Sequence, residues 1–341
     1  MIKILELFGG IGSPRIALRN LGIPVKSIDY VEIDEKAVRS YNSIFKNELP
    51  YKTQNVCGWN LNPDILIHGS PCQDFSIAGK QHGADEGSET RSSLMWETIK
   101  IINNLGKLRP RIIIWENVKN VRSKYMRHNH DRYMDELLKM GYSSSFALLD
   151  ARDFGLPQAR QRYFTVSCLN GHKFDFKSLE HREMQNIWDF IQPDNEVEDK
   201  YTIKSPSMLS CIDPENFDNA PLNKLSIVKN MVFTITTYQD RCPNSGIIKR
   251  SNGQYRLLTE KECWRLQGFS DDDYEAALKA NPGRQGYKNN ILYKQAGNSI
   301  PIPILEEIFL SMRRQSLLKQ VHFPLYHFGK GASGHTVHRY R

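Results

Sequence analysis

Short runs of apolar residues alternate with amphipathic stretches through the first half of the chain. Continuous runs rich in Ile and Leu indicate strands that are buried on both faces of a sheet. Strands that alternate with helices are typical of a parallel, doubly wound α/β sheet. The pattern predicts strands over residues 2–8, 27–33, 64–68, 111–115 and 162–167, and helices over residues 14–21, 92–105 and 131–140.

The pattern changes after about residue 167. Residues 170–255 are polar, rich in Asn and Asp, and lack the strand–helix alternation, which indicates a second, small and irregular domain. Residues 302–317 return to helical periodicity and are expected to pack back on the first domain. The sequence therefore predicts one domain over 1–168 plus 283–320, a second over 169–282, and a basic tail over 321–341.

Composition narrows the class of protein. A chain of 341 residues with 40% hydrophobic content can build one large domain with its own core and a smaller one. The N-terminus lacks the basic region and apolar run of a signal peptide, and no stretch of about 18 apolar residues occurs. The six cysteines include no CxxC pair. We therefore expect a cytoplasmic protein with no membrane segment and no metal site.

The net charge of +8 is concentrated at one end. Residues 313–341 hold six Lys or Arg and no acidic residue, so residues 1–312 carry only +2. A solvated basic tail explains this charge as well as a nucleic-acid partner does. Charge alone is weak evidence for a nucleic-acid partner.

A glycine turn follows the first predicted strand. Glycines at 9, 10 and 12 let the backbone approach a nucleotide-like ligand at the start of the following helix. Glu32, at the end of the next strand, could accept hydrogen bonds from both ribose hydroxyls. The turn lacks a full GxGxxG and a phosphate-binding lysine, which favours a nucleoside without pyrophosphate, such as S-adenosylmethionine. On these residues alone, a tight turn without a ligand remains an alternative.

Reactive side chains follow several of the strands. Cys72 comes directly after a strand and Pro71, at the carboxyl edge where ligands bind in such sheets. Glu116 follows another apolar strand at the same edge. Arg160 and Arg162 alternate along a strand, so they would share one face and need an anionic partner. Each has an ordinary structural alternative: a buried cysteine, for example, or a carboxylate near a helix start.

Taken in order, these motifs resemble the set found in bacterial and phage DNA cytosine-5 methyltransferases. The resemblance covers about residues 1–168 and 230–310 and fades between them. It implies a Rossmann-like, S-adenosylmethionine-dependent methyltransferase fold with a small target-recognition domain. The motifs are Phe8-x-Gly10-x-Gly12, Pro71-Cys72-Gln73, Glu116-Asn117-Val118, Gln158-x-Arg160-x-Arg162 and Gly297-Asn298-Ser299.

The resemblance implies a reaction and roles for its residues. Cys72 would attack cytosine C6 as a thiolate, which makes C5 nucleophilic toward a methyl sulfonium. Glu116 would hold cytosine N3 and share a proton there. Arg162 would contact the base and orient that carboxylate, with Arg160 closer to the base–backbone side. Because C6 is inaccessible in a stacked duplex, the target cytosine must be flipped out.

The resemblance also assigns binding residues. Residue 55 is Asn where the family usually has Asp, and residue 13 is Ser where glycine is frequent. The segment 232–238 matches a threonine-containing core of the recognition domain, and Gln and Arg are the usual readers of adenine and guanine. Expected cofactor contacts are Phe8, Gly10, Ile11, Gly12, Glu32, Ile33, Asn55, Pro71, Leu94, Asn298 and Ser299; expected DNA contacts are Ser76, Lys80, Thr236, Gln239 and Arg241.

These roles define a specific activity and two alternatives. The expected enzyme methylates C5 of cytosine in a specific double-stranded DNA site, releases S-adenosylhomocysteine, acts as a monomer, and has a cognate restriction endonuclease as a candidate partner. The first alternative is a tRNA cytosine-5 methyltransferase, but the Cys-Phe-Thr signature of those enzymes is absent from the sequence. The second is a DNA-binding relative that has lost catalysis. The full set of Cys72, Glu116 and Arg162 argues against this second alternative.

Overall fold

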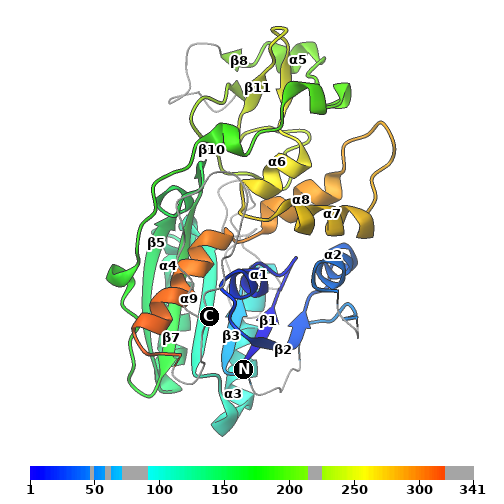
Figure 1. Cartoon of the computed structure of the whole chain (residues 1–341). Helices are drawn as coiled ribbons and strands as arrows, with labels where there is room; N and C mark the ends of the chain where they lie inside the picture. The colour runs from blue at the N-terminus through cyan, green and yellow to red at the C-terminus, as the bar shows by residue number, and fades with distance from the viewer. Residues whose placement is uncertain (47–49, 58–62, 71–90, 214–224, 319–341) are drawn as a thin grey trace, which may run out of the picture.

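The structure is a computed structural model that describes residues 1–46, 50–57, 63–70, 91–213 and 225–318. These residues form a large lobe built on a sheet and a smaller lobe that lies beyond the ends of the strands of that sheet (Figure 1). In the described ranges, no helix is long and apolar enough to cross a membrane.

The sheet of the large lobe has the strand order β2-β1-β3-β4-β7-β5. The pairs β1–β2, β1–β3 and β3–β4 are parallel, whereas β7 runs antiparallel to both β4 and β5. The sheet is therefore mixed, which corrects the expectation of a wholly parallel one. The strands are β1 (Ile2–Leu7), β2 (Val25–Val31), β3 (Ile65–His68), β4 (Ile112–Val118), β5 (Tyr142–Asp150) and β7 (Gln161–Leu169).

The reversal of β7 follows from its connection. Residues 151–160, between β5 and β7, hold a 3-10 turn, η4 (Ala151–Asp153), and the short strand β6 (Gln158–Ala159), but no crossover helix. A strand that returns without a crossover helix pairs antiparallel with its predecessor. The first residues of β7 therefore lie at the carboxyl end of β4.

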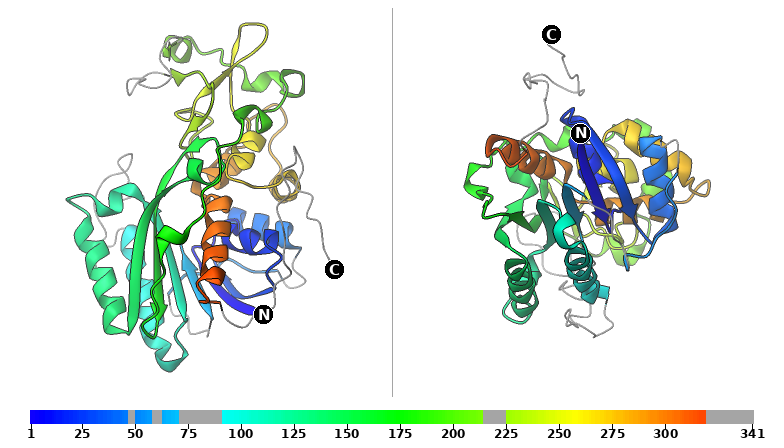
Figure 2. Two further views of the ribbon diagram at one scale, coloured as in Figure 1. Left: turned by 60° about the vertical axis from the view of Figure 1, so that its left-hand side comes forward. Right: turned by 90° about the horizontal axis from the view of Figure 1, so that it is seen from below.

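Helices cover both faces of the sheet, as the view from below shows (Figure 2). Alternate residues of each strand face opposite layers: Ile2 and Ile4 join the cluster that contains α1 and α9, whereas Leu5 and Leu7 join the cluster that contains α3 and α4. Helix α9, in the range predicted to pack back on the first domain, lies against α1. The helices are α1 (Ser13–Asn20), α2 (Glu35–Phe45), α3 (Met95–Asn104), α4 (Arg127–Lys139) and α9 (Ile302–Arg314).

The smaller lobe has little regular structure, as the polar sequence predicts. Its elements are α5 (Pro206–Leu209), β8 (Ile212–Asp213), β9 (Leu225–Ser226), β10 (Val232–Phe233), β11 (Ile247–Lys249) and β12 (Tyr255–Leu257). β10 pairs in parallel with β6, which ties the lobe to the segment that leads into β7. Short 3-10 turns occur along the rest of the chain as well, including the large lobe: η1 (Arg91–Leu94), η2 (Gly106–Leu108), η3 (Lys119–Arg122), η5 (Phe176–Ser178), η6 (Ile187–Asp189), η7 (Asp194–Glu196) and η8 (Asp199–Tyr201).

Three helices connect the lobes: α6 (Glu260–Arg265), α7 (Asp271–Ala280) and α8 (Asn290–Asn298). Although α7 falls in the range predicted for the second domain, it packs against α2 of the large lobe. Both guanidinium Nη atoms of Arg19, in α1, donate to the Asp273 carboxylate at 2.8 Å. The segment after α6 is therefore held on the large lobe.

Candidate active site

Glu116 and Arg162 are brought together by the register of β4 and β7. Glu116 pairs with Phe164 and Val118 pairs with Arg162, so Glu116 and Arg162 are diagonal neighbours on one sheet face. Arg162 Nε lies 3.1 Å from Glu116 Oε1, and the two side chains are only 14% and 13% exposed. This ion pair lies at the carboxyl end of β4, where the sequence predicts the site.

The environment of Glu116 acts on its carboxyl group in opposing directions. Burial raises the pKa of Glu116, while the positive charges of Arg162 and then Arg160 lower it. The net direction is upward. A carboxyl group with a raised pKa next to a guanidinium can hold a proton and share it with a bound base.

Glu116 also lies against the chain that leads to Cys72. A β-carbon built on Gly69 would be 3.5 Å from Glu116 Oε2, so the carboxylate rests over the Gly69 backbone. The Trp115 indole N–H donates to Ser70 Oγ at 3.1 Å, which fixes the next residue against β4. Pro71 and Cys72 themselves lie outside the described residues. Nothing in the sequence pattern predicts the contact between Ser70 and Trp115.

Arg160 makes different contacts from Arg162. It lies between β6 and β7, outside both strands, so the alternation that predicted a shared face does not extend through it. Its side chain is buried; Nη1 donates to the Ile235 carbonyl, and Nη2 donates to the carbonyls of Gly297 and Ser299, all at 2.9 Å. Arg160 therefore joins the segment after β10 to the end of α8.

The glycine turn after β1 forms as predicted and is closed by Glu32. Gly10 N–H donates to Glu32 Oε2 at 3.0 Å, and the N–H groups of Ile33 and Asp34 donate to Oε1 at 2.8 Å. Gly12 has φ of +86°, and a β-carbon there would lie 2.6 Å from the Phe45 ring. Only glycine fits that position. Burial raises the pKa of Glu32, which these backbone donors oppose.

Apolar side chains surround this turn. Phe8, with φ of +54°, and Leu94 are half-buried and pack against the same core cluster. Ile33, two residues after the end of β2, is 72% exposed. Gln54 N–H donates to the Glu32 carbonyl at 2.8 Å, which brings Asn55 to the same edge. The residue types here suit an adenosine, because they combine apolar side chains with a carboxylate.

The end of α8 reaches this edge from the other side. Gln295 donates to the Lys36 carbonyl and accepts from Ser40 Oγ, both at 3.1 Å, so α8 is docked on α2. Ser299 is buried and its Oγ donates to the Gln295 carbonyl at 2.6 Å, whereas Asn298 is exposed. Ile11 is buried within the core.

The DNA-contact residues have different surroundings. Ser76 and Lys80 lie outside the described residues. A β-carbon on Gly297 would be 2.5 Å from the Thr236 carbonyl carbon, so the segment after β10 packs directly on α8. The Arg241 guanidinium lies over the ring of the exposed Tyr238, 5.1 Å from the ring centroid. Gln239, which lies between these two residues in the sequence, is fully buried.

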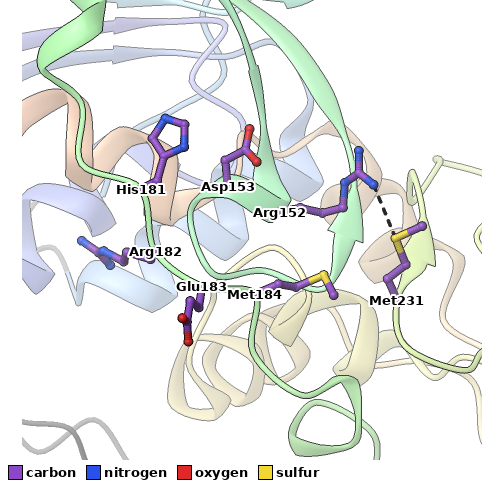
Figure 3. A pocket seen from close by; sticks show the side chains of 7 residues that line it. All are labelled: Arg152, Asp153, His181, Arg182, Glu183, Met184 and Met231. Atoms are coloured by element: carbon purple, nitrogen blue, oxygen red, sulfur yellow. Dashed lines mark hydrogen bonds between the residues drawn. The ribbon is translucent and has the colours of Figure 1, made fainter.

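A separate pocket is lined by other residues than those described above (Figure 3). The Arg152 guanidinium donates to Met231 Sδ at 3.8 Å across it. Its lining among the described residues includes no predicted site residue: Arg152, Asp153, His181, Arg182, Glu183, Met184 and Met231. It is therefore not assigned to the site.

Comparison with known proteins identifies the family. The model of the C-5 cytosine-specific DNA methylase family matches residues 2–314. The chain belongs to that family. As a cytosine-5 DNA methylase it is 28% identical to the Type II methyltransferase M2.ScrFI of Lactococcus lactis subsp. cremoris, over 91% of this chain and 98% of the relative. It is also 28% identical to the Type II methyltransferase M.HhaI of Haemophilus parahaemolyticus, over 90% and 93% of the two chains.

Solved structures share the fold of this methylase. The Dnmt2 methyltransferase of S. pombe superposes with a TM-score of 0.69 at 19% identity, over 93% of this chain and 99% of that one. A prophage-encoded putative DNA modification methyltransferase of E. coli superposes with a TM-score of 0.65 at 17% identity, over 94% and 100%. The predicted methyltransferase fold is thereby confirmed.

Proposed function

We propose that this enzyme transfers a methyl group from S-adenosylmethionine to C5 of a flipped cytosine in a specific double-stranded DNA site, through a covalent bond between Cys72 and C6. The observation that carries the proposal is the buried pair of Glu116 and Arg162, packed against Gly69 three residues before Cys72. A carboxyl group that can carry a proton is what cytosine N3 requires when a thiolate adds to C6.

The chain's own residues supply most of the reaction. The Cys72 thiolate forms a bond to C6, and the π-electron pair of the C5–C6 double bond is delocalised over C5 and N3 while Glu116 shares a proton with N3. Arg162 orients that carboxylate and balances the negative charge of the adduct. After C5 has gained the methyl group, loss of its proton to a base restores the C5–C6 double bond and expels Cys72 as thiolate.

The cofactor assignment rests on the fit of the glycine turn. S-adenosylmethionine bound there would supply an electrophilic methyl group. Glu32 would accept from the ribose hydroxyls, and Phe8, Ile33 and Leu94 would enclose the adenine. Gly10, Ile11, Gly12, Asn55, Pro71, Asn298 and Ser299 complete the proposed contacts, and S-adenosylhomocysteine is the product.

The names of the relatives lead to proposals about biological setting. Since they are Type II methyltransferases, we place this enzyme in a restriction–modification system, with a cognate endonuclease as partner. We further propose that it acts as a monomer in the cytoplasm, on DNA contacted through Ser76, Lys80, Thr236, Gln239 and Arg241.

The test is transfer of tritium from labelled S-adenosylmethionine to unmethylated plasmid DNA, with Cys72→Ser in parallel. Label on DNA that disappears in the variant supports the proposal, and bisulfite sequencing then gives the site. Label on tRNA but not on DNA would favour the tRNA enzyme. DNA binding without transfer to either substrate would favour a relative that has lost catalysis.

A further inference from the structure

A tight turn after β10 holds a buried amide with no hydrogen-bond partner. The N–H groups of Arg241 and Cys242 both donate to the Tyr238 carbonyl, at 3.0 and 2.8 Å, and this closes the turn. Gln239, inside it, is 0% exposed, and both its Nε2 and its Oε1 lack a partner. Ser245 Oγ, six residues on, is likewise buried without a partner.

The buried, unpaired carboxamide of Gln239 makes this conformation of the turn less stable. Native proteins pair nearly all their buried polar side-chain groups, because a buried donor or acceptor without a partner has lost its hydrogen bonds to water. Leu would fill nearly the same volume as Gln239 without that penalty. The other buried glutamines among the described residues are paired; Gln267 Nε2, for example, donates to the Ala296 carbonyl at 2.8 Å.

The turn is placed to meet DNA next to the active site. The chain entering it packs on Gly297, and the Ile235 carbonyl accepts from Arg160, two residues from Arg162. Two residues near Gln239 are exposed: Tyr238, directly before it, is 59% exposed, and the Arg241 side chain, two residues after it, is 67% exposed, whereas Asp240 between them is buried. A stacked aromatic ring and guanidinium form a surface suited to bases and phosphates.

We propose that Gln239 is a specificity-determining residue whose carboxamide is stored in the turn of the free protein and turns outward to pair with a base edge when DNA binds. A carboxamide offers one donor and one acceptor side by side, which matches adenine N7 and N6 in the major groove. The inference rests on the proposed function. Because the carboxamide has no partners in the free protein, it breaks no hydrogen bond when it leaves the turn. The hydrogen bonds that it forms with a base are therefore not offset by bonds lost.

The experiment compares Gln239→Leu with Gln267→Leu and wild type. Thermal unfolding without DNA should show that Gln239→Leu raises Tm by about 2 °C or more, whereas Gln267→Leu lowers it, because only Gln267 loses hydrogen bonds. Bisulfite sequencing of methylated plasmid should show that Gln239→Leu relaxes selection at one base pair of the site by about tenfold or more.

Each arm can overturn its part of the proposal. A lowered Tm for Gln239→Leu would mean that the amide is satisfied in the free protein, and the stored state would be rejected. An unchanged methylation profile would show that Gln239 reads no base. If wild type labels no DNA, the methyl-transfer proposal fails separately, and the Tm comparison still decides whether the amide is stored without partners.

Discussion

At Glu116, burial and neighbouring guanidinium groups act on one carboxyl group in opposite directions, and burial prevails. Its raised pKa makes the carboxyl group easier to protonate than an ordinary glutamate, and the 3.1 Å contact to Arg162 holds it in one position. A glutamine at 116 would have nearly the same shape but could not share that proton.

For Glu116→Gln we therefore expect kcat for methyl transfer to fall by about 10²- to 10⁴-fold, the usual contribution of general acid–base catalysis. Cofactor and DNA binding should change little, because the amide still fits beside Gly69. Single-turnover kinetics with binding measured separately would test this. A variant with near wild-type kcat would show that no proton passes through Glu116.

Glu6 provides a second buried carboxyl group with a different consequence. Its Oε2 accepts from the Tyr41 hydroxyl at 2.6 Å, while its buried Oε1 has no partner. Burial raises the pKa of Glu6 to about 7, from an ordinary 4.5. The folded protein thus binds this proton more tightly than the unfolded chain does. The resulting stabilisation is complete below about pH 4.5 and is lost as pH rises through about 7.

Glu6→Gln should remove this pH dependence. Relative to the variant, wild type should lose roughly 2–3 kcal/mol of unfolding free energy between pH 4.5 and pH 8, since each unit of pKa shift corresponds to about 1.4 kcal/mol. Urea unfolding of both proteins at several pH values would measure the difference. Parallel pH profiles for the two proteins would contradict the assignment.

At the scale of elements, the site depends on contacts between segments far apart in sequence. Arg160 donates to the carbonyls of Ile235, Gly297 and Ser299, so one side chain joins the segment after β10 to the end of α8. The close packing of Gly297 on Thr236 holds the same junction. The segment after β10 and the proposed cofactor contacts at the end of α8 therefore share Arg160 as a common support.

Arg160→Met should weaken both ligands together. Three carbonyls lose a charged donor, so we expect about 3 kcal/mol or more of lost stability and reduced affinity for both S-adenosylmethionine and DNA. Arg152→Met is the matched control, because Arg152 is 39% exposed and bonds chiefly to Asp150. Calorimetric titration with each ligand would test this. Loss of kcat with both affinities intact would instead indicate direct contact with the base.

The sequence predicts some of these elements better than others. Strands such as β3 and β4 are identifiable because buried strands are continuous runs of Ile and Leu. β5 escapes prediction because its start, Ser143–Ser145, is polar and only half-buried. The position of Glu116 at a strand end could be predicted, but its pairing with Arg162 depends on the reversal of β7, which local pattern does not specify. Contacts such as Trp115 with Ser70 depend on register and likewise leave no sequence signal.

At the scale of the whole molecule, the two lobes share an apolar core but differ in what supplements it. Apolar clusters lie on both faces of the sheet of the large lobe, and one of them continues into the small lobe through Val228, Val232 and Ile248. The small lobe relies in part on a fully buried ion pair: Arg256 donates to both carboxylate oxygens of Glu262, at 2.9 and 2.8 Å, with both side chains 0% exposed. Glu262 is also part of the capping box of α6.

Arg256→Met should destabilise the small lobe strongly. Removing one partner leaves the Glu262 charge buried and uncompensated, which costs about 3–5 kcal/mol. Lys204→Met is the control, because the ion pair of Lys204 with Asp199 is exposed and should not affect stability. Hydrogen exchange should show earlier opening of β11 and β12 than of β1 and β4. Uniform behaviour across both lobes would contradict separate stabilisation.

The docking of α8 on α2 has a consequence for the timing of synthesis. The glycine turn and Glu32 leave the ribosome early, but Asn298 and Ser299, at the end of α8, emerge only after the small lobe has been made. The two groups of proposed cofactor contacts are thus separated in sequence by the lobe that we propose reads DNA. A nascent or truncated chain that lacks the small lobe and everything after it also lacks the proposed contacts at the end of α8. Premature termination should therefore yield an inert fragment rather than a methylase without sequence selectivity.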